Sequence, residues 1–257
     1  MEVIILDSVE KASDKGAAIV EGLIKRKKDC VLGLATGRTP NELYKRLIGK
    51  HRSGGLDFSN VSSFNLDEYV GLEPSDPASY RHTINSVFLS HVNIDLSRTH
   101  VPNGMAKVIP AHCLEYENAI VEAGGIDLQI LGLGGNGHIG FNEPTSSLGS
   151  RTRIKTLTQK TLEANKSQFS TPPKHCITMG IATIMEARHC LLLAFGESKA
   201  QAVADFVEGP ITSMVPASAL QMHPHVTVLL DEAAASKLKR ADYYKEVLDS
   251  KPEWQRF

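Results

Sequence analysis

The sequence predicts an α/β protein with an open, mainly parallel twisted sheet flanked by helices, a modified Rossmann-like fold in a single domain. The first observation is that short apolar runs alternate with longer amphipathic stretches, the pattern of β-α-β units. The second is length: 257 residues are enough for one large core, and no linker or internal repeat divides them. The third is that several apolar runs end in glycine-rich or polar turns, where parallel sheets bind ligands.

The first half of the chain is expected to alternate strands and helices. A helix beginning at Ser8 ends in basic residues, which the helix dipole favours. After the second strand, Thr39, Pro40 and Glu42 have the pattern of a capping box that opens a helix. The expected strands are residues 3–6, 30–35 and 61–66, and the expected helices are about 8–28, 78–89 and 111–123.

The second half continues the alternation but contains one stretch of different composition. From Thr145 to Lys174, hydroxyl-bearing and basic residues dominate, and apolar periodicity is weak. We expect this stretch, approximately 145–174, to be a lid over the site; an ordinary surface insertion is the alternative. The other expected elements are strands at 128–131, 190–195 and 226–230, helices at 180–187 and 196–208, and a charged helical tail.

Composition and charge exclude several classes of protein. The net charge is −1, from 28 basic and 29 acidic residues, which argues against a nucleic-acid scaffold or an anionic-membrane binder. No apolar run approaches the roughly 20 residues that span a bilayer, and the N-terminus is too acidic for a signal peptide. We expect reduced core thiols in a cytoplasmic protein, not metal ligands, at Cys30, Cys113, Cys176 and Cys190.

The segment from Gly132 to Pro144 is the most informative stretch of the chain. An apolar run leads into four glycines within six positions, and Asn136, His138, Asn142 and Glu143 stand among and after them. Such a loop lets a ligand approach the backbone closely, and His138 with Glu143 is a candidate proton-handling pair. The alternative is that both are ordinary hydrogen-bonded loop residues.

The glycines of this segment also fit the dinucleotide fingerprint G-x-G-x-x-G, at Gly132, Gly134 and Gly137. That motif requires a helix at its third glycine and an acidic residue about 20 positions further on. Here Pro144 disfavours a long helix, and residues 151–155 are basic. No metal-ligand cluster or cofactor lysine motif is visible either, so we expect neither a nicotinamide nor any other cofactor, and no metal.

Two expected helix starts carry basic side chains. One strand-to-helix turn would present backbone N–H groups and the positive end of the helix dipole to an anion. Lys199 stands in the first turn of another helix, where a bound anion would offset the repulsion between its charge and the dipole. The residues expected to bind phosphate are Thr36, Gly37, Arg38, Thr39 and Lys199. A plain turn and a solvated lysine are the alternatives.

Two acidic residues, Asp67 and Glu68, directly follow the apolar strand at 61–66. Carboxylates at such a point are typical of a site, although we expect one of the two to be a solvated loop charge. Because the carboxyl ends of parallel strands meet at one edge of a sheet, Asp67, the His138 segment and the phosphate-binding residues should share a crevice. The residues thus indicate a cofactor-free proton-transfer enzyme acting on a sugar phosphate.

Four motifs in this order resemble the glucosamine-6-phosphate deaminase family: LGLATGRTP, FNLDEYVGL, GLGGNGHIGFNEP and SRTRIKTL, within a resemblance over residues 31–238. The resemblance implies conversion of glucosamine 6-phosphate and water to fructose 6-phosphate and ammonia, in amino-sugar catabolism. It also implies that Asp67 moves a proton between C2 and C1 and that His138 opens the sugar ring, held by Asn136 and Glu143. Such a base works best near neutral pH, so burial should raise the pKa of Asp67.

The chain departs from this family's pattern in two places. Many members carry aspartate at Asn136, and an amide cannot stabilise an imidazolium as a carboxylate would. The lid of many members carries a phosphate-binding arginine where this chain has Ser167, so Lys166 or Arg38 would substitute. Some members are hexamers activated by N-acetylglucosamine 6-phosphate, so a homo-oligomer is among the expectations. The positions that match the regulated type are Ser146, Arg153 and Lys155.

Two other functions stay open at this point. A related sugar-phosphate lactonase or isomerase, such as a 6-phosphogluconolactonase, would share the phosphate loop, but we do not expect it to combine the DEYVGL and NGHIGFNEP stretches. A non-enzymatic sugar-phosphate-sensing domain would need an attached DNA-reading segment, and no basic helix-turn-helix pattern is visible in the sequence.

Overall fold

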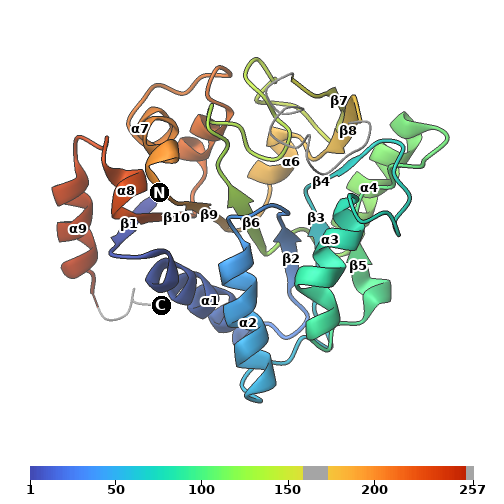
Figure 1. The fold of residues 1–257 in the computed structure, drawn as a ribbon, viewed down its shortest axis with the longest axis horizontal. Helices are drawn as coiled ribbons and strands as arrows, with labels where there is room; N and C mark the ends of the chain where they lie inside the picture. The colour runs from blue at the N-terminus through green and yellow to red at the C-terminus, as the bar shows by residue number, and fades with distance from the viewer. Residues whose placement is uncertain (159–172, 253–257) are drawn as a thin grey trace.

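Strands and helices alternate along the chain (Figure 1), in a computed structural model that describes residues 1–158 and 173–252. The strands are β1 Glu2–Leu6, β2 Val31–Leu34, β3 Ser62–Asn65, β4 Asp67–Tyr69, β5 Thr99–His100, β6 Leu128–Gly132, β7 Arg153–Thr156, β8 His175–Thr178, β9 Cys190–Ala194 and β10 Val226–Asp231. The α-helices are α1 Val9–Arg26, α2 Asn41–Arg52, α3 Tyr80–Val87, α4 Ile109–Glu122, α6 Ile181–Met185, α7 Ala200–Val207, α8 Glu232–Ala235 and α9 Ala241–Asp249. Short 3-10 helices are η1 Leu89–His91, η2 Leu96–Arg98, η4 Glu197–Lys199 and η5 Pro216–Met222.

The main sheet confirms the predicted fold class. Among the described residues it has seven strands in the order β1-β10-β9-β6-β2-β3-β5, and every neighbouring pair is parallel. The central strand β6 pairs with β2 on one side and with β9 on the other. The chain therefore winds outward from the middle of the sheet in both directions, and the switch between directions opens a crevice at the strand carboxyl ends.

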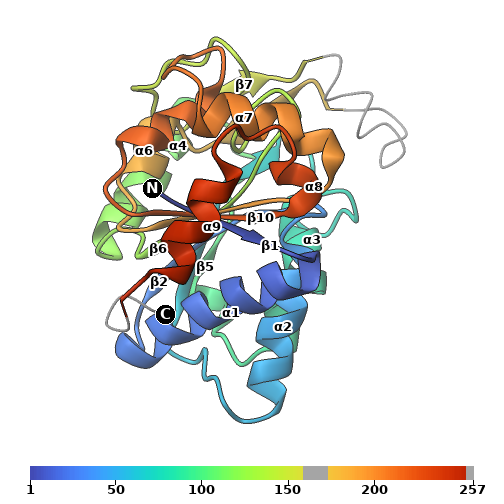
Figure 2. The same cartoon turned by 90° about the vertical axis from the view of Figure 1, so that its left-hand side faces the viewer.

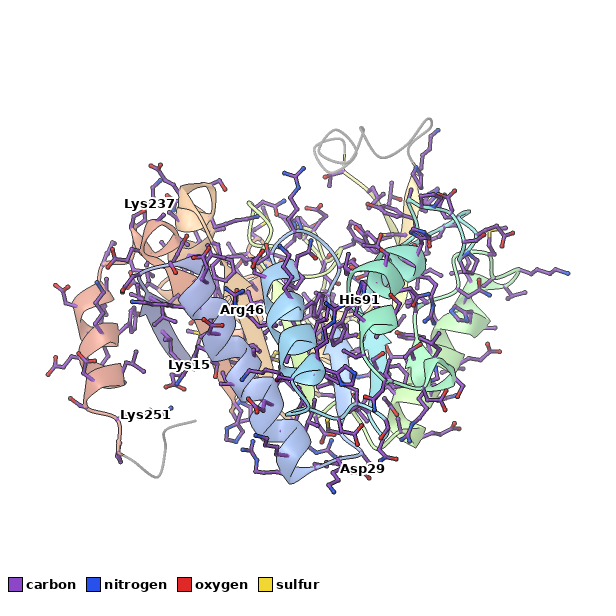
Figure 3. All side chains as sticks on the ribbon, turned by 60° about the horizontal axis from the view of Figure 1, so that its bottom comes forward. Lys15, Asp29, Arg46, His91, Lys237 and Lys251 are labelled. Carbon is purple, nitrogen blue, oxygen red and sulfur yellow. The ribbon has the colours of Figure 1, made fainter. Side chains whose placement is uncertain are left out.

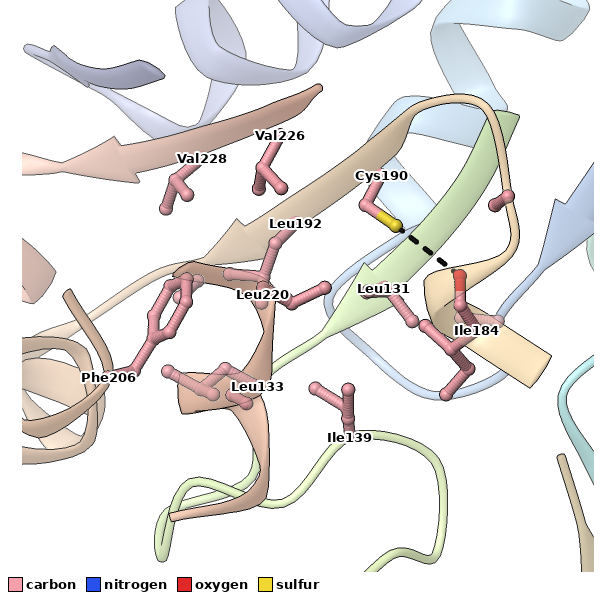
Figure 4. Close-up of a cluster of buried hydrophobic side chains, with 14 of the residues drawn as sticks. Leu131, Leu133, Ile139, Ile184, Cys190, Leu192, Phe206, Leu220, Val226 and Val228 are labelled. Atoms are coloured by element: carbon pink, nitrogen blue, oxygen red, sulfur yellow. Dashed lines mark hydrogen bonds between the residues drawn. The ribbon is translucent and has the colours of Figure 1, made fainter. Parts of the chain in front are cut away.

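Helices cover both faces of this sheet. Alternate residues of β9 point to opposite faces: Leu191 and Leu193 pack with α1 and α2, whereas Cys190 and Leu192 pack with α6 and α7. Figure 2 shows α1 and α2 on one side of the sheet and α6 and α7 on the other. Figure 4 shows the buried cluster on the α6 and α7 side of the sheet, which includes Leu192, Val228 and Phe206. Burial on both faces explains why a strand such as β9 is a continuous apolar run rather than an alternating one.

Charged side chains cover the outer surface of the helices (Figure 3). Arg46 of α2 illustrates the arrangement: its Nε lies 2.8 Å from Asp14 Oδ1 of α1, across the seam between the two helices. Within the described residues, no helix is long and apolar enough to cross a membrane. All four cysteines are buried and free, as predicted.

A second, smaller sheet was not predicted. It is antiparallel, in the order β4-β8-β7, and it pairs Asp67 with Thr178 and Tyr69 with Cys176. Its strands carry few apolar residues and β4 has only three residues, so neither length nor periodicity indicates strands there. One strand, β7, falls within the expected lid at 145–174; residues 159–172 lie outside the described part, and the lid stays a prediction.

The start of α2 differs from the expected capping box. The helix begins at Asn41 with Pro40 as N-cap, and no side chain caps it, so the capping role predicted for Thr39 is wrong. The Asn41 N–H donates to the Arg38 carbonyl at 3.3 Å, in a turn that precedes the helix. Thr39 therefore lies one residue too early to cap. The predicted start of α1 is confirmed, because Ser8 is its N-cap and accepts from the Lys11 N–H.

Candidate active site

A cavity of about 370 Å³ opens at the carboxyl edge of the main sheet. Its walls come from the loops after β2, β3, β6 and β9, and from the first turn of α3. The prediction that these strand ends share one crevice is confirmed. The site residues predicted from sequence that line the cavity are Thr36, Gly37, Arg38, Thr39, Asp67, Asn136, His138 and Lys199.

One end of the cavity has the character of an anion site. Gly37 has a φ of +114°, which turns the backbone between β2 and α2 as few other residues could. The N-terminal end of the 12-residue helix α2 follows this turn, and Pro40 also lines the cavity. Lys199 ends η4 and is the N-cap residue of α7. A phosphate held here would meet backbone dipoles and cations together.

His138 belongs to a hydrogen-bond chain with Asn136 and Glu143. The Asn136 Nδ2 donates to Glu143 Oε2 at 2.8 Å, which leaves Asn136 Oδ1 to face His138 Nδ1 at 2.6 Å. Because an amide oxygen only accepts, Nδ1 must carry the hydrogen, and in the neutral ring Nε2 keeps its lone pair. Glu143 Oε2 also lies 3.5 Å from His138 Nδ1. Glu143 does not line the cavity, but it fixes the tautomer of the histidine that does.

The loop carrying His138 is anchored and closely packed. Leu133 and Ile139, which precede and follow the polar residues, are buried in the core (Figure 4). A Cβ at Gly134 would lie 2.2–2.4 Å from atoms of the His138 ring, so only glycine lets the ring occupy its place. Gly140 has a φ of +56°, and its Cβ position would lie 3.4 Å from Asp67 Oδ2. The His138 segment therefore passes directly beside Asp67.

Asp67 is buried without a compensating cation. Only 6% of it is exposed, and among the residues that the structure describes no basic side chain forms an ion pair with it. Burial, and then the like charge of Glu68, raise the pKa of Asp67 to about 8. This direction confirms the expectation that burial raises the pKa of Asp67. The expectation that one of the two carboxylates is solvated is wrong, because Glu68 is only 2% exposed.

Sequence reasoning missed an aromatic wall beside Asp67. Tyr80 and Phe141 line the cavity, and their rings stack with centroids 5.9 Å apart. The Tyr69 hydroxyl lies 3.1 Å from the Tyr80 hydroxyl, and the two rings pack at 4.8 Å. These residues come from three separate segments, so no local pattern indicates the contact. A tyrosine immediately after the Ser79 N-cap of α3 is the one available signal, and it is weak.

The three residues matched to a regulated type do not line this cavity. The Ser146 side chain is buried, and its backbone N–H donates to the Glu143 carbonyl at 3.0 Å. Arg153 and Lys155 lie on the same face of β7, and Arg153 lines a separate cavity of about 450 Å³ beside α4. Ser167 and Lys166 lie outside the described residues. A regulatory role for the set stays a prediction.

The arrangement suits acid–base chemistry on a small anion. An aspartate with a raised pKa accepts a proton near neutral pH, and a histidine with a fixed tautomer exchanges one at its Nε2. Both line a cavity that is also lined by the turn after β2 and by the cations Arg38 and Lys199. The fingerprint for a dinucleotide is not fulfilled in structure, because residues 133–152, all described, contain no helix.

The comparisons with known proteins all find similarity to one family of sugar-phosphate enzymes. A profile of the family described as glucosamine-6-phosphate isomerases/6-phosphogluconolactonase matches residues 7–229. Proteins named glucosamine-6-phosphate deaminase from Arthrobacter sp. (strain FB24) and Mycolicibacterium smegmatis are 55% and 51% identical, each over 99% of both chains. A solved structure of a monomeric glucosamine-6-phosphate deaminase has a TM-score of 0.90 at 45% identity, over 92% of this chain and 100% of the other. A 6-phosphogluconolactonase from Leishmania guyanensis shares the fold, with a TM-score of 0.73 at 22% identity over 91% of this chain and 97% of the other.

Proposed function

This chain belongs to the family of glucosamine-6-phosphate isomerases and 6-phosphogluconolactonases, and we propose that within it the chain is a glucosamine-6-phosphate deaminase. It converts glucosamine 6-phosphate and water to fructose 6-phosphate and ammonia, a step in carbohydrate metabolism. The observation that supports this most is that Asp67, buried and without an ion pair among the described residues, and His138, whose tautomer is fixed, line one cavity with Arg38 and Lys199.

The proposed reaction begins with ring opening at His138. Its Nε2 accepts the proton of the C1 hydroxyl and returns a proton to the ring oxygen, which breaks the bond between that oxygen and C1. The Glu143 carboxylate, 3.5 Å from Nδ1, stabilises the imidazolium that forms between the two transfers. The amide of Asn136 relays this orientation but carries no charge.

Asp67 then carries the carbon proton. In the open chain, C2 lies next to the aldehyde, so removal of its proton gives an enol-type species without a cofactor. Delivery of a proton to C1 leaves an imine at C2; water adds to that carbon and ammonia departs. Because the pKa of Asp67 is raised to about 8, the carboxylate is a much stronger base than a solvated aspartate.

The phosphate end supplies position rather than chemistry. We propose that the turn Thr36–Thr39 and Lys199 bind the phosphate of the substrate, with Arg38 in place of the arginine that many relatives carry in the lid. Anchoring this non-reacting group fixes the distance from C1 and C2 to His138 and Asp67. A neutral amino sugar without phosphate should therefore bind weakly.

The decisive experiment compares three substrates. Purified protein, without added cofactor, should release ammonia from glucosamine 6-phosphate, leave 6-phosphogluconolactone unhydrolysed above background, and leave N-acetylglucosamine 6-phosphate unchanged. Lactone hydrolysis without ammonia release would identify a 6-phosphogluconolactonase instead. Binding of glucosamine 6-phosphate by calorimetry with neither reaction would indicate a sugar-phosphate-sensing domain.

Site of action and assembly are further parts of this proposal. We propose that the enzyme works in the cytoplasm, where reduced cysteines persist and phosphorylated sugars are made. A homo-oligomer stays a prediction of the family resemblance, in which some members are hexamers. One relative of known structure, at 45% identity, is a monomeric deaminase, so light scattering on the purified chain is a direct test. A single monomeric species at micromolar concentration would refute the oligomer.

A further inference from the structure

Glu68, next to Asp67 in the chain, is buried in an unusual set of contacts. Its Oε1 accepts the Tyr69 and Tyr80 N–H groups at 2.8 and 2.9 Å, and its Oε2 accepts the Arg81 N–H at 2.9 Å. Two of these donors are the first N–H groups of α3, which otherwise have no partner within the helix. The third N–H of the helix, from His82, goes to the Ser79 side chain. Glu68 thus caps the N-terminus of α3 and links it to β4.

The start of α3 matters because Tyr80 stands there. Its ring stacks on Phe141, its hydroxyl meets Tyr69, and it lines the cavity beside Asp67. We infer that Glu68 is a positioning residue for the proton transfer: its carboxylate anchors Tyr80 over the cavity and places a fixed negative charge beside Asp67. This inference rests on the proposed function, in which Asp67 is the base.

Among the described residues, Glu68 is the charged group that raises the pKa of Asp67. The other titratable groups around Asp67 are the phenols of Tyr69, Tyr80 and Tyr116 and the thiol of Cys176, and His138, Arg38 and Lys199 line the same cavity. Burial raises the pKa of each of the three phenols and of the thiol, so these four groups are neutral at physiological pH. Within the described residues, Arg81 is the cation whose charge favours the ionised form of Glu68, and its guanidinium donates to Thr99 Oγ1 and the Thr99 carbonyl at 2.9 and 2.8 Å.

The hydrogen bonds of Glu68 act against the effect of its burial. Burial raises the pKa of Glu68, but three N–H donors and Arg81 favour its ionised form. A second carboxylate close by then resists ionisation, as in any pair of acids that share a site. Proton affinity at Asp67 therefore depends on a residue that need not touch the substrate.

The test is the pH profile of kcat/KM for glucosamine 6-phosphate in the Glu68→Gln variant. Glutamine keeps the shape and an acceptor oxygen but removes the charge, so the acid limb should move to lower pH. For each pH unit of movement, kcat/KM well below the limb rises about tenfold relative to its plateau. An acid limb that coincides with the wild-type limb would overturn the inference.

Glu117→Gln is the matched control. Glu117 is also a buried carboxylate, 8% exposed, and it accepts a backbone N–H from Thr152 at 2.7 Å, but it lies beside α6 and outside the cavity. It should lose stability like any buried hydrogen-bonded acid, with no movement of the acid limb. A purely structural role for Glu68 would give the same result in both variants. Failure of the wild type to release ammonia would instead refute the proposed function.

Glu68→Asp separates the effect of the charge on Asp67 from the anchoring of Tyr80. It keeps the charge but shortens the reach to α3, so the acid limb should stay in place while KM rises and kcat falls. Movement of the acid limb to lower pH in this variant too would show that the charge is not the cause. If Glu68→Gln does not fold, carbon-13 titration of the wild-type carboxyls decides: Glu68 should ionise before Asp67, and the reverse order would overturn the inference.

Discussion

Two aspartates of this protein are equally buried at opposite edges of one sheet. Asp67 and Asp127 are each 6% exposed. Asp127, just before β6 at the amino edge, accepts from the Val31 N–H at 2.8 Å and pairs with Lys27 at 2.8 Å and Arg188 at 3.1 Å. Asp67, at the carboxyl edge, has Glu68 as its charged neighbour, and burial leaves its pKa at about 8.

The contrast shows that a buried acid can have either of two roles, depending on the charges around it. A buried carboxylate with cations and N–H donors ties segments together, here α1, β2, β6 and the turn before β9. A buried carboxylate beside another negative charge is held in a state that favours proton uptake, which costs stability and supplies a base. Exposure alone does not distinguish the two; the sign of the neighbouring charges does.

The largest expected difference between the two aspartates is in catalysis. Asp67→Asn removes the proposed base and should lower kcat about 100- to 10,000-fold, the usual contribution of general acid–base catalysis. Asp127→Asn should leave kcat near the wild-type value, because it lies at the other edge of the sheet. Ammonia release measures both, and binding of the substrate to Asp67→Asn by calorimetry shows that its site is intact. Equal losses of kcat in the two variants would show that the two aspartates do not differ in their role in catalysis.

Stability against pH sharpens the same comparison. The folded pKa of Asp67, about 8, lies above its unfolded value near 3.8, so this group stabilises the fold fully below about pH 4. That contribution is lost as pH rises toward 8, by up to roughly 4 kcal/mol between pH 5 and pH 8. Asp67→Asn should lose less stability over this range than wild type, whereas Asp127→Asn should be less stable at pH 7 by about 1–3 kcal/mol. Urea unfolding at several pH values measures both.

The His138 chain provides a smaller effect at the same edge. Glu143→Gln removes the charge 3.5 Å from His138 Nδ1 while keeping an oxygen for Asn136. The imidazolium loses about 1.5–3 kcal/mol of charge-assisted stabilisation, so kcat should fall about 10- to 100-fold. KM should change little, because Glu143 does not line the cavity. A variant with wild-type kcat would show that Asn136 alone orients the histidine.

The smallest effect is expected at the phosphate end. Arg38 lines the cavity and is exposed, so Arg38→Ala should raise KM for glucosamine 6-phosphate about threefold to tenfold with little change in kcat. Lys237→Ala is the matched control, since Lys237 is an exposed cation on the outer surface (Figure 3). Steady-state kinetics at two salt concentrations measure the effect. An unchanged KM would mean that Arg38 is not a phosphate ligand.

Much of the architecture was accessible from sequence because its causes are local. Strands buried on both faces read as apolar runs, and β9, Cys190–Ala194, is such a run in both the prediction and the structure. The rule that parallel strands end at one edge then brings Asp67, His138 and Lys199 together, and the cavity confirms this. Family resemblance added the chemistry that the residue types alone left open.

The features that the sequence does not indicate depend on tertiary contacts. The strand β4 is three residues of charged and aromatic character that become a strand only by pairing with β8, over 100 residues later. The sequence predicts a solvated acid at Glu68 or Asp67, but α3 supplies N–H donors that bury Glu68. The stacking of Tyr80 on Phe141 joins segments that are far apart in the sequence. Thr39 fits a capping box, yet the preceding turn moves the N-cap by one residue, to Pro40. Periodicity carries no information on such contacts.

The central claim, that the Asp67 carboxylate moves the C2 proton, is tested most directly with glucosamine 6-phosphate deuterated at C2. Wild-type protein should remove that deuterium, leaving it at C1 of the product or exchanging it with water, as read by proton NMR. Asp67→Asn should bind the same substrate and retain the deuterium at C2. Removal of the deuterium by Asp67→Asn at the wild-type rate would contradict the account.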